Sequence, residues 1–275
     1  MVKILFKRSI FSLHKALDIL FCFGFDQKVL SAQAISERLN IPLSTTYRYL
    51  AILLERGFLD RTPDTRKYKL GLMLFQLGNI VSSKIKFVDI VMPHMISLSS
   101  LSGETVLLSV LNGSKALCIE KVEPNKLIKM SIERGSSFPL YAASSGKLLL
   151  AYQNDSFIDS ILQKVLFTKF TDYTITDPIL LKKELKDIRE QGFAISDQEV
   201  ELGARSISAP VIDHKGKVIA ALSIAGPSER IKSENIPPLT QMVKDTSKKA
   251  SYDLIYGESD KYATSQFTGK TDRID

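Results

Sequence analysis

Apolar residues in the first third of the chain recur at intervals of three and four, the spacing of a helix with one buried face. Three amphipathic helices are predicted on this basis, over residues 12–23, 31–38 and 44–56. Only a short break that contains Asn40 and Pro42 separates the second from the third. Because proline is tolerated in the first turn of a helix, we expect a helix-turn-helix here.

Two short alternating stretches follow, at residues 58–61 and 67–70. They flank Thr62-Pro63-Asp64-Thr65-Arg66, a run of turn-forming residues, and therefore predict a β-hairpin. Three helices followed by a hairpin are typical of a winged helix-turn-helix. A further apolar pattern from Leu70 to about Lys84 predicts a connector helix that also closes the small core.

The remaining chain alternates between period-two and helical patterns. Strands are predicted at residues 105–111, 115–122, 127–133, 193–196, 206–212 and 218–225, and helices at 88–101, 144–152, 177–191 and 237–255. The Asn112-Gly113 pair favours a tight hairpin, and Thr176 is expected to cap the helix that begins near Pro178. This order predicts an α+β domain with a mainly antiparallel sheet.

A length of 275 residues favours two domains. We expect a winged helix-turn-helix domain at 1–69, a connector helix at 70–87 and a second domain at 88–257. The tail at 258–275 is polar and without periodicity, so we expect disorder there.

Charge distinguishes the two halves. Residues 1–86 hold 14 Lys and Arg against 6 Asp and Glu, a net charge of +8, whereas residues 87–275 hold 23 against 24, a net charge of −1. A small basic domain beside a near-neutral one fits a polyanion-binding module, because neutralised phosphates supply most nonspecific affinity for nucleic acids.

The third predicted helix has two different sides. Tyr47, Leu50, Leu53 and Leu54 are expected to pack, and the opposite side carries short hydroxyls with an arginine one turn later, as a recognition helix does in a major groove. The predicted contacts to double-stranded DNA are Ser44, Thr45, Thr46, Arg48, Tyr49, Arg61, Arg66 and Lys67. The alternative is that the hydroxyls only support the helix start and Arg48 is a solvated charge.

Several classes of function find no support in the sequence. No apolar run approaches the roughly 20 residues of a membrane span, and no signal-peptide cleavage pattern is present, so we expect a cytoplasmic protein. Cys22 and Cys118 have no partners at metal-ligand spacing. Because the three histidines lie in separate segments and no phosphate loop or nucleophile motif occurs, we predict no catalytic residue, metal or cofactor.

Two segments of the second domain suggest a site. Residues 142–147 begin a helix with small side chains, which leaves amides and two hydroxyls open to an anion such as a carboxylate. Plain capping with tight packing is the alternative. Asp197, Glu199 and Glu201 alternate, which we interpret as a solvated loop with one pocket residue rather than a pair of catalytic carboxylates.

Short motifs in both halves resemble one known family, the IclR-type transcriptional regulators. In the first half they are Lys15-Ala16-Leu17-Asp18-Ile19-Leu20, Ser44-Thr45-Thr46-Tyr47-Arg48, Gly57-Phe58-Leu59 and Tyr68-Lys69-Leu70-Gly71. In the second half they are Gly103-Glu104-Thr105-Val106, Pro139-Leu140, Ser145-Gly146-Lys147, Gly192-Phe193-Ala194, Glu199 with Gly203, Ala209-Pro210-Val211 and Gly226-Pro227. The resemblance covers roughly residues 9–256.

The resemblance implies a winged helix-turn-helix joined to a GAF-like effector-binding domain. It implies a homo-oligomer, a dimer or a dimer of dimers, that binds a pseudo-palindromic operator under control of a small-molecule effector, an organic acid or an aromatic compound. The implied effector contacts are Leu127, Ser144, Ser145, Asp197, Ser206 and Ser223. Ser206 replaces a frequent Cys, Ala225 replaces a frequent Ser, and Ser196 precedes Asp197 where some members have two acids, so the effector itself cannot be inherited.

Two alternatives from other classes remain open at this point. The chain could be a metabolite-binding enzyme with an appended winged helix, or its winged helix could serve protein contacts only. The first predicts turnover and no operator. The second predicts that replacing Arg48 or Arg66 by Ala leaves the affinity for DNA unchanged.

Overall fold

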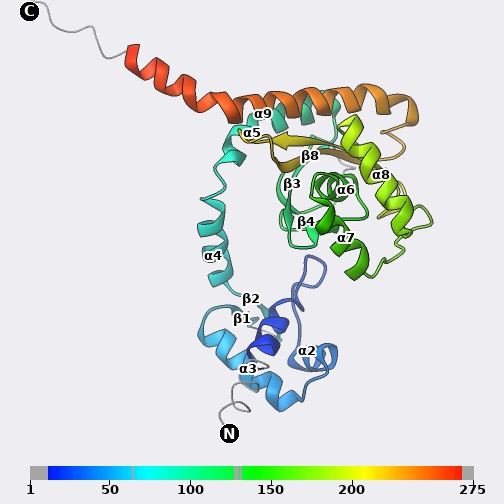
Figure 1. The fold of residues 1–275 in the computed structure, drawn as a ribbon. Helices are drawn as coiled ribbons and strands as arrows, with labels where there is room; N and C mark the ends of the chain where they lie inside the picture. Colours follow the sequence, from blue (N-terminus) through cyan, green and yellow to red (C-terminus); the bar gives the residue numbers. More distant parts are fainter. Residues whose placement is uncertain (1–11, 64, 127–129, 131, 268–275) are drawn as a thin grey trace, which may run out of the picture. The chain divides into compact units, whose positions relative to one another are not determined.

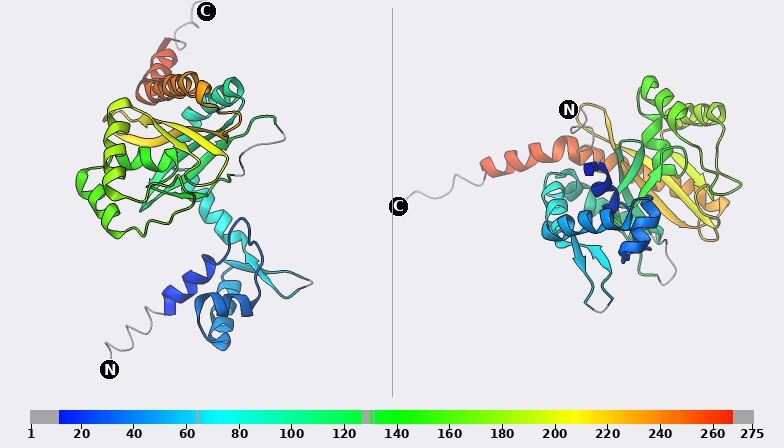
Figure 2. Two further views of the ribbon diagram at one scale, coloured as in Figure 1. Left: turned by 90° about the vertical axis from the view of Figure 1, so that its right-hand side faces the viewer. Right: turned by 90° about the horizontal axis from the view of Figure 1, so that it is seen from below.

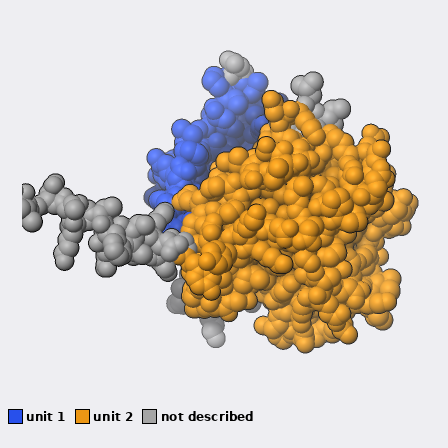
Figure 3. All heavy atoms as spheres, turned by 90° about the horizontal axis from the view of Figure 1, so that it is seen from above, with its two compact units in different colours: residues 1–86 blue, residues 87–275 orange. Residues whose placement is uncertain are grey.

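The computed structural model describes residues 12–63, 65–126, 130 and 132–267, with backbone only for 257–267. Contacts within the chain divide it into two compact units, residues 1–86 and 87–275, which are coloured separately in Figure 3. The finer domain bounds, with a separate connector at 70–87, stay a prediction.

The described residues of the first unit form four helices and a small hairpin, which can be followed in Figure 1. After a helix that covers residues 12–20 come α2 (Ala32–Leu39), α3 (Leu43–Glu55), β1 (Leu59–Arg61), β2 (Tyr68–Leu70) and α4 (Leu72–Ser82). Ser31 caps α2 as its sequence suggests, since its Oγ accepts a hydrogen bond of 3.1 Å from the amide of Ala34. This order confirms the predicted winged helix-turn-helix.

The core of this unit joins all of its elements except α4. Its most buried side chains are Ile19, Leu30, Ile35, Leu50, Leu59 and Tyr68. In α3 the buried stripe is Thr46, Leu50 and Leu53, and Tyr47 is 51% exposed. The prediction that Tyr47 packs inward was therefore wrong. The Thr46 hydroxyl makes burial tolerable because it donates to the Pro42 carbonyl at 3.2 Å.

A close backbone approach joins the end of the hairpin to the end of α3. A Cβ at Gly71 would lie 2.1 Å from the carbonyl oxygen of Gly57, so no larger residue fits there. The amide of Gly71 also donates to the Phe58 carbonyl at 2.8 Å. The glycines of the two family-like motifs thus meet in space.

Helix α4 has no buried residue within its own unit. Met73 and Leu74 are half-buried, and its other large apolar side chains are exposed in the single chain: Leu72, Phe75, Leu77, Ile80 and Val81. The prediction that this helix closes the small core was therefore wrong.

The second unit is built on one six-stranded antiparallel sheet, in the order β5-β4-β3-β8-β7-β6. The strands are β3 (Thr105–Asn112), β4 (Lys115–Val122), β5 (Ser137–Pro139), β6 (Ala194–Asp197), β7 (Ala204–Ile212) and β8 (Val218–Pro227). The predicted α+β class with an antiparallel sheet is confirmed.

Helices cover both faces of this sheet (Figures 1 and 2). They are α5 (Phe87–Ser102), α6 (Ser144–Ala151), α7 (Asp155–Lys164), α8 (Pro178–Gln191) and α9 (Ile236–Phe267), with the short 3₁₀ helix η1 (Ser233–Asn235) before the last. Helices α5 and α9 bury one face through residues such as Met95 and Val243. Helices α6, α7 and α8 bury the other through residues such as Leu149 and Leu185.

Several predicted elements differ from the observed ones. The strand expected at 127–133 lies partly outside the described residues, and β5 at the sheet edge and α7 were not predicted. Helix α8 is capped by Asp177, not Thr176, because the Asp177 carboxylate accepts from the amides of Ile179 and Leu180. Helix α9 runs on to Phe267, so the expected disorder was wrong for 258–267, and 268–275 lies outside the described residues.

No helix in the described part of the chain is both long and apolar enough to span a membrane.

Candidate functional site

The first candidate surface is the exposed side of α3. Ser44, Tyr47 and Arg48 are exposed there and lie one turn apart, while Thr45 is half-buried. Arg48 has no hydrogen bond or ion pair to any described residue. Its guanidinium is therefore available to a ligand outside the unit.

The hairpin adds further cations. Its turn is closed by the amide of Thr62, which donates to the Lys67 carbonyl at 2.9 Å, and Arg66 and Lys67 are exposed in it. Arg61 lies on the strand with its guanidinium 5.4 Å from the centre of the Tyr68 ring, an arrangement that holds the charge in place. Within the described residues, neither Arg66 nor Lys67 forms an ion pair.

Two of the predicted DNA contacts have another role in the structure. Thr46 is completely buried, so the prediction that its side chain reaches DNA is corrected. Tyr49 is half-buried, and its hydroxyl lies 3.1 Å from the Oγ of Ser12. Both hold α3 against the rest of the unit. Tyr47, which was expected to pack inward, lies on the exposed side of α3 instead.

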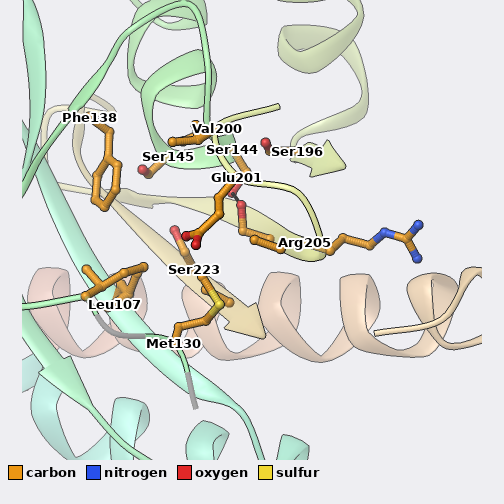
Figure 4. Close-up of a pocket in the computed structure, with 15 residues that line it drawn as sticks. Leu107, Met130, Phe138, Ser144, Ser145, Ser196, Val200, Glu201, Arg205 and Ser223 are labelled. Atoms are coloured by element: carbon orange, nitrogen blue, oxygen red, sulfur yellow. Dashed lines mark hydrogen bonds between the residues drawn. The ribbon is translucent and has the colours of Figure 1, made fainter. Parts of the chain in front are cut away.

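The second candidate site is a cavity of about 90 Å³ in the second unit, between the start of α6 and the sheet (Figure 4). Its walls are mainly apolar. The lining residues are Leu107, Met130, Ile132, Phe138, Ala143, Ser144, Ser145, Ser196, Val200, Glu201, Ala204, Arg205, Ser206, Ser223 and Ala225.

Backbone constraints shape the start of α6. Ala143 has φ 62° and ψ 142°, a conformation that costs free energy for any residue with a Cβ. A Cβ at Gly146 would lie 2.3 Å from the Pro139 carbonyl oxygen, so glycine lets the helix approach the β5 segment. These two features bring Ser144 and Ser145 to the cavity wall.

A chain of hydroxyls crosses from α6 to the sheet. The Ser144 Oγ donates to Ser206 at 2.7 Å and accepts from Ser208 at 2.7 Å, and Ser208 lies 2.6 Å from the Oγ of Ser223. The structure thus brings together four of the six predicted effector contacts: Ser144, Ser145, Ser206 and Ser223. Ser208 was missed, although it follows Ser206 on the same face of a strand.

The other two predicted effector contacts are not part of the wall. The Asp197 carboxylate is held by the Arg205 guanidinium in two hydrogen bonds, of 2.9 and 2.6 Å, and Asp197 does not line the cavity. The prediction that Asp197 contacts the effector is therefore corrected, and its neighbour Ser196 lines the cavity instead. Leu127 lies outside the described residues.

A buried ion cluster lies behind the cavity. Lys147 on α6 is completely buried and pairs with Glu184 and with Glu199, whose carboxylate is 2.5 Å from Nζ. Burial raises the pKa of Glu199, and the charge of Lys147 opposes this rise. Because Thr174 also donates to the Glu199 carbonyl at 2.6 Å, the loop after β6 is fixed from two directions.

Other reactive groups are not gathered into a centre. Among the described residues, no group of three His, Cys, Asp or Glu side chains is placed to hold a metal ion. Both cysteines are buried and unpaired, and burial raises the pKa of Cys118 to about 11.

Two family models match the chain. The IclR helix-turn-helix domain matches residues 12–63, and the bacterial transcriptional regulator IclR C-terminal matches residues 80–252, more than half of the chain. The chain belongs to the IclR family. It is accordingly a DNA-binding transcriptional regulator, which removes the alternative of an enzyme with an appended winged helix.

Relatives within the IclR family agree with this assignment. The HTH-type transcriptional repressor AllR of Escherichia coli K12 is 32% identical over 221 residues, which cover 80% of this chain and 82% of that protein. The IclR of Thermotoga maritima is 31% identical with a TM-score of 0.68, over 89% of this chain and 99% of that one. An IclR homolog from Microbacterium hydrocarbonoxydans, complexed with 4-hydroxybenzoate, is 26% identical with a TM-score of 0.76, over 88% and 98%.

Proposed function

We propose that this protein represses transcription by binding a double-stranded DNA operator through α3 and the β1–β2 hairpin, and that a small organic molecule in the second unit changes its affinity for that operator. The observation that carries the proposal is Arg48, an exposed cation on the open side of α3 without a counter-charge in the described residues. We place its action in the cytoplasm, where bacterial DNA lies.

The proposed division of labour follows from the side chains. Ser44, Thr45 and Arg48 enter the major groove together with Tyr47, because a helix fits that groove and arginine reads guanine edges. Arg61, Arg66 and Lys67 contact phosphates beside it, which adds affinity without sequence preference. The basic net charge of the first 86 residues supports this arrangement.

A homo-oligomer is proposed as the active form, a dimer or a dimer of dimers. The exposed apolar side chains of α4, among them Leu72, Phe75 and Val81, support it, because contiguous exposed apolar surface marks an interaction site. A two-fold axis then predicts two operator half-sites about one helical turn, or a multiple of it, apart.

The effector site is proposed to be the cavity at the start of α6. Its apolar walls and its few polar groups are the usual features of a small-molecule site. The structurally similar homolog that is complexed with 4-hydroxybenzoate supports an organic effector for this chain as well.

Selection of bound fragments from genomic DNA tests the proposal. The wild-type chain should enrich one pseudo-palindromic sequence, and Arg48→Ala should lose most of that enrichment. Lys215→Ala removes an exposed charge from the second unit and is the matched control, with no expected change. Failure to enrich any sequence, or equal losses in both variants, would overturn the proposal and favour a winged helix used for protein contacts.

A further inference from the structure

We infer that the effector of this protein presents N–H donors to Glu201, as a neutral carboxamide or a small organic cation does, and is not a carboxylate. The inference rests on the proposed function, because it takes the cavity at the start of α6 as the effector site.

Glu201 is the charged side chain that points into the cavity. It is an exposed residue on the loop between β6 and β7, and Figure 4 shows its carboxylate directed toward the cavity, on the side of Ser223. None of the described residues pairs with this carboxylate. A ligand carboxylate placed beside it would meet a like charge, which raises the free energy of binding.

The cation in the cavity lining does not offset that charge. Arg205 points away from the cavity in Figure 4, and its guanidinium is already bound to Asp197 and to the Ile231 carbonyl, at 2.5 Å. Lys147 lies on α6 but is completely buried against Glu184 and Glu199. No other cation among the described lining residues remains for a carboxylate.

The serine hydroxyls at the cavity wall offer a ligand more hydrogen-bond acceptors than donors. Since Ser208 donates to Ser144 and Ser144 donates to Ser206, the proton between Ser208 and Ser223 comes from Ser223. The hydroxyl protons of Ser144, Ser208 and Ser223 are thus used within the chain, whereas Ser206 and Ser145, which both line the cavity, keep theirs for a ligand. The free lone pairs of these oxygens favour a ligand that donates.

The amides at the start of α6 complete the pattern. Ser144 and Ser145 begin the helix at the cavity wall, where backbone N–H groups lack partners within the helix. A carboxamide satisfies both sides of the cavity, because its oxygen accepts from these amides while its NH₂ donates to Glu201. A carboxylate satisfies only the helix start.

The size of the cavity limits the ligand to a few heavy atoms. Its volume is about 90 Å³, whereas an engineered cavity of about 150 Å³ takes a benzene molecule. The side chains of Leu107, Met130 and Phe138 offer contact to a short hydrocarbon portion.

The test uses three probes of the same shape and different charge: propionate, propionamide and propionamidinium. Their affinities for the full-length chain are measured at constant pH and ionic strength by ligand-detected NMR and titration calorimetry, since the chain has no tryptophan to report binding. Propionamide and propionamidinium should each bind at least about tenfold more tightly than propionate, a difference of about 1.4 kcal/mol.

The Glu201→Gln variant keeps the shape of the side chain and removes its charge. It should weaken propionamidinium binding about tenfold and strengthen propionate binding, while Glu234→Gln, which removes an exposed charge outside the cavity, should change neither. Thermal unfolding of both variants checks that they are folded.

Three results would overturn the inference: tightest binding of propionate to the wild type, an order that Glu201→Gln leaves unchanged, or no binding of any probe at tens of millimolar. Operator binding, measured in parallel without probes, reports on the proposed function separately. If the chain binds its operator but prefers propionate, the proposed function holds and the inference about the ligand class is wrong. If the chain binds no DNA, the proposed function itself is wrong.

Discussion

The two units of this protein differ in whether the cations compared here are paired with carboxylates. In the first unit, Arg48, Arg66 and Lys67 are exposed and form no ion pair with any described residue. In the second unit, Lys147, Arg205 and Arg230 each hold one or two carboxylates at short range. An unpaired cation on a surface is available to phosphates, and a paired one inside a domain holds loops and strands in a fixed geometry.

Exposed unpaired cations and buried paired charges differ in how much free energy they cost the folded state. Unpaired exposed cations cost little because water solvates them, and they release counterions when DNA binds. Paired buried charges lose their solvation, so they are tolerated only where geometry and hydrogen bonds compensate. We therefore expect substitutions of paired charges in the second unit to lower the free energy of unfolding strongly. Substitutions of unpaired cations in the first unit should lower only the affinity for DNA.

Lys147→Met should have the largest effect. The change leaves Glu199 buried without its counter-charge, and breaking a buried pair in this way costs about 3 to 5 kcal/mol. Urea unfolding measures the loss. Lys186→Met, which removes an exposed partner of Glu190 at 3.8 Å, is the control and should stay within about 1 kcal/mol. Similar losses in both variants would contradict the contrast between buried and exposed pairs.

The loss in Lys147→Met should also depend on pH. Burial already raises the pKa of Glu199 above its ordinary value of 4.5, and removal of Lys147 raises it further. A carboxyl with a raised pKa contributes its full stability below the ordinary value and loses it as pH rises through the raised value. The deficit relative to wild type should therefore shrink toward pH 4 and be greatest near pH 8. A deficit that does not vary with pH would argue for a packing defect instead.

Arg48→Ala should have the next largest effect, and on DNA only. Loss of an arginine that reads a base costs about 1 to 3 kcal/mol of operator affinity and relaxes the preference at one position. Electrophoretic shifts with the selected operator and with single-base variants measure both. Its free energy of unfolding should stay close to that of the wild type, because the side chain is exposed and forms no hydrogen bond or ion pair with any described residue.

Lys67→Ala should have a smaller and less selective effect. A lysine that contacts phosphate adds affinity to all sequences, so the loss should be the same on operator and on unrelated DNA, and the slope of log affinity against log salt should fall by about one. Binding isotherms at several salt concentrations test this. A loss confined to the operator would instead place Lys67 on a base.

Ala143→Gly should have the smallest effect, and of the opposite sign. Relief of the backbone strain at φ 62° is worth about 1 to 3 kcal/mol, against an entropic cost of about 0.5 to 1 kcal/mol for glycine. A net stabilisation of about 1 kcal/mol is expected by urea unfolding. Ala151→Gly, in the same helix without positive φ, should destabilise and so separates strain relief from a general effect of glycine.

Helix α3 shows what the spacing of apolar residues predicts and what it does not. The helix, its neighbours and the hairpin were predicted correctly because their apolar spacing and turn residues are local signals. Leu50 and Leu53 are buried as predicted, but Tyr47 is exposed and Thr46 is buried, which the apolar pattern does not indicate because Tyr47 is large and aromatic and Thr46 is small and polar. A buried position for Thr46 depends on the Pro42 carbonyl, which the hydroxyl reaches only when the turn is folded.

The sequence by itself determined the class of both halves, the location of the basic charge and four of the residues that gather at the cavity. Only the tertiary structure decided which charges are paired: Asp197 is held by Arg205, Lys147 is buried between two glutamates, and Glu201 points into the cavity. The reason is that local propensity depends on neighbours in sequence, whereas the partner of a charge depends on loops and strands brought together across the whole fold.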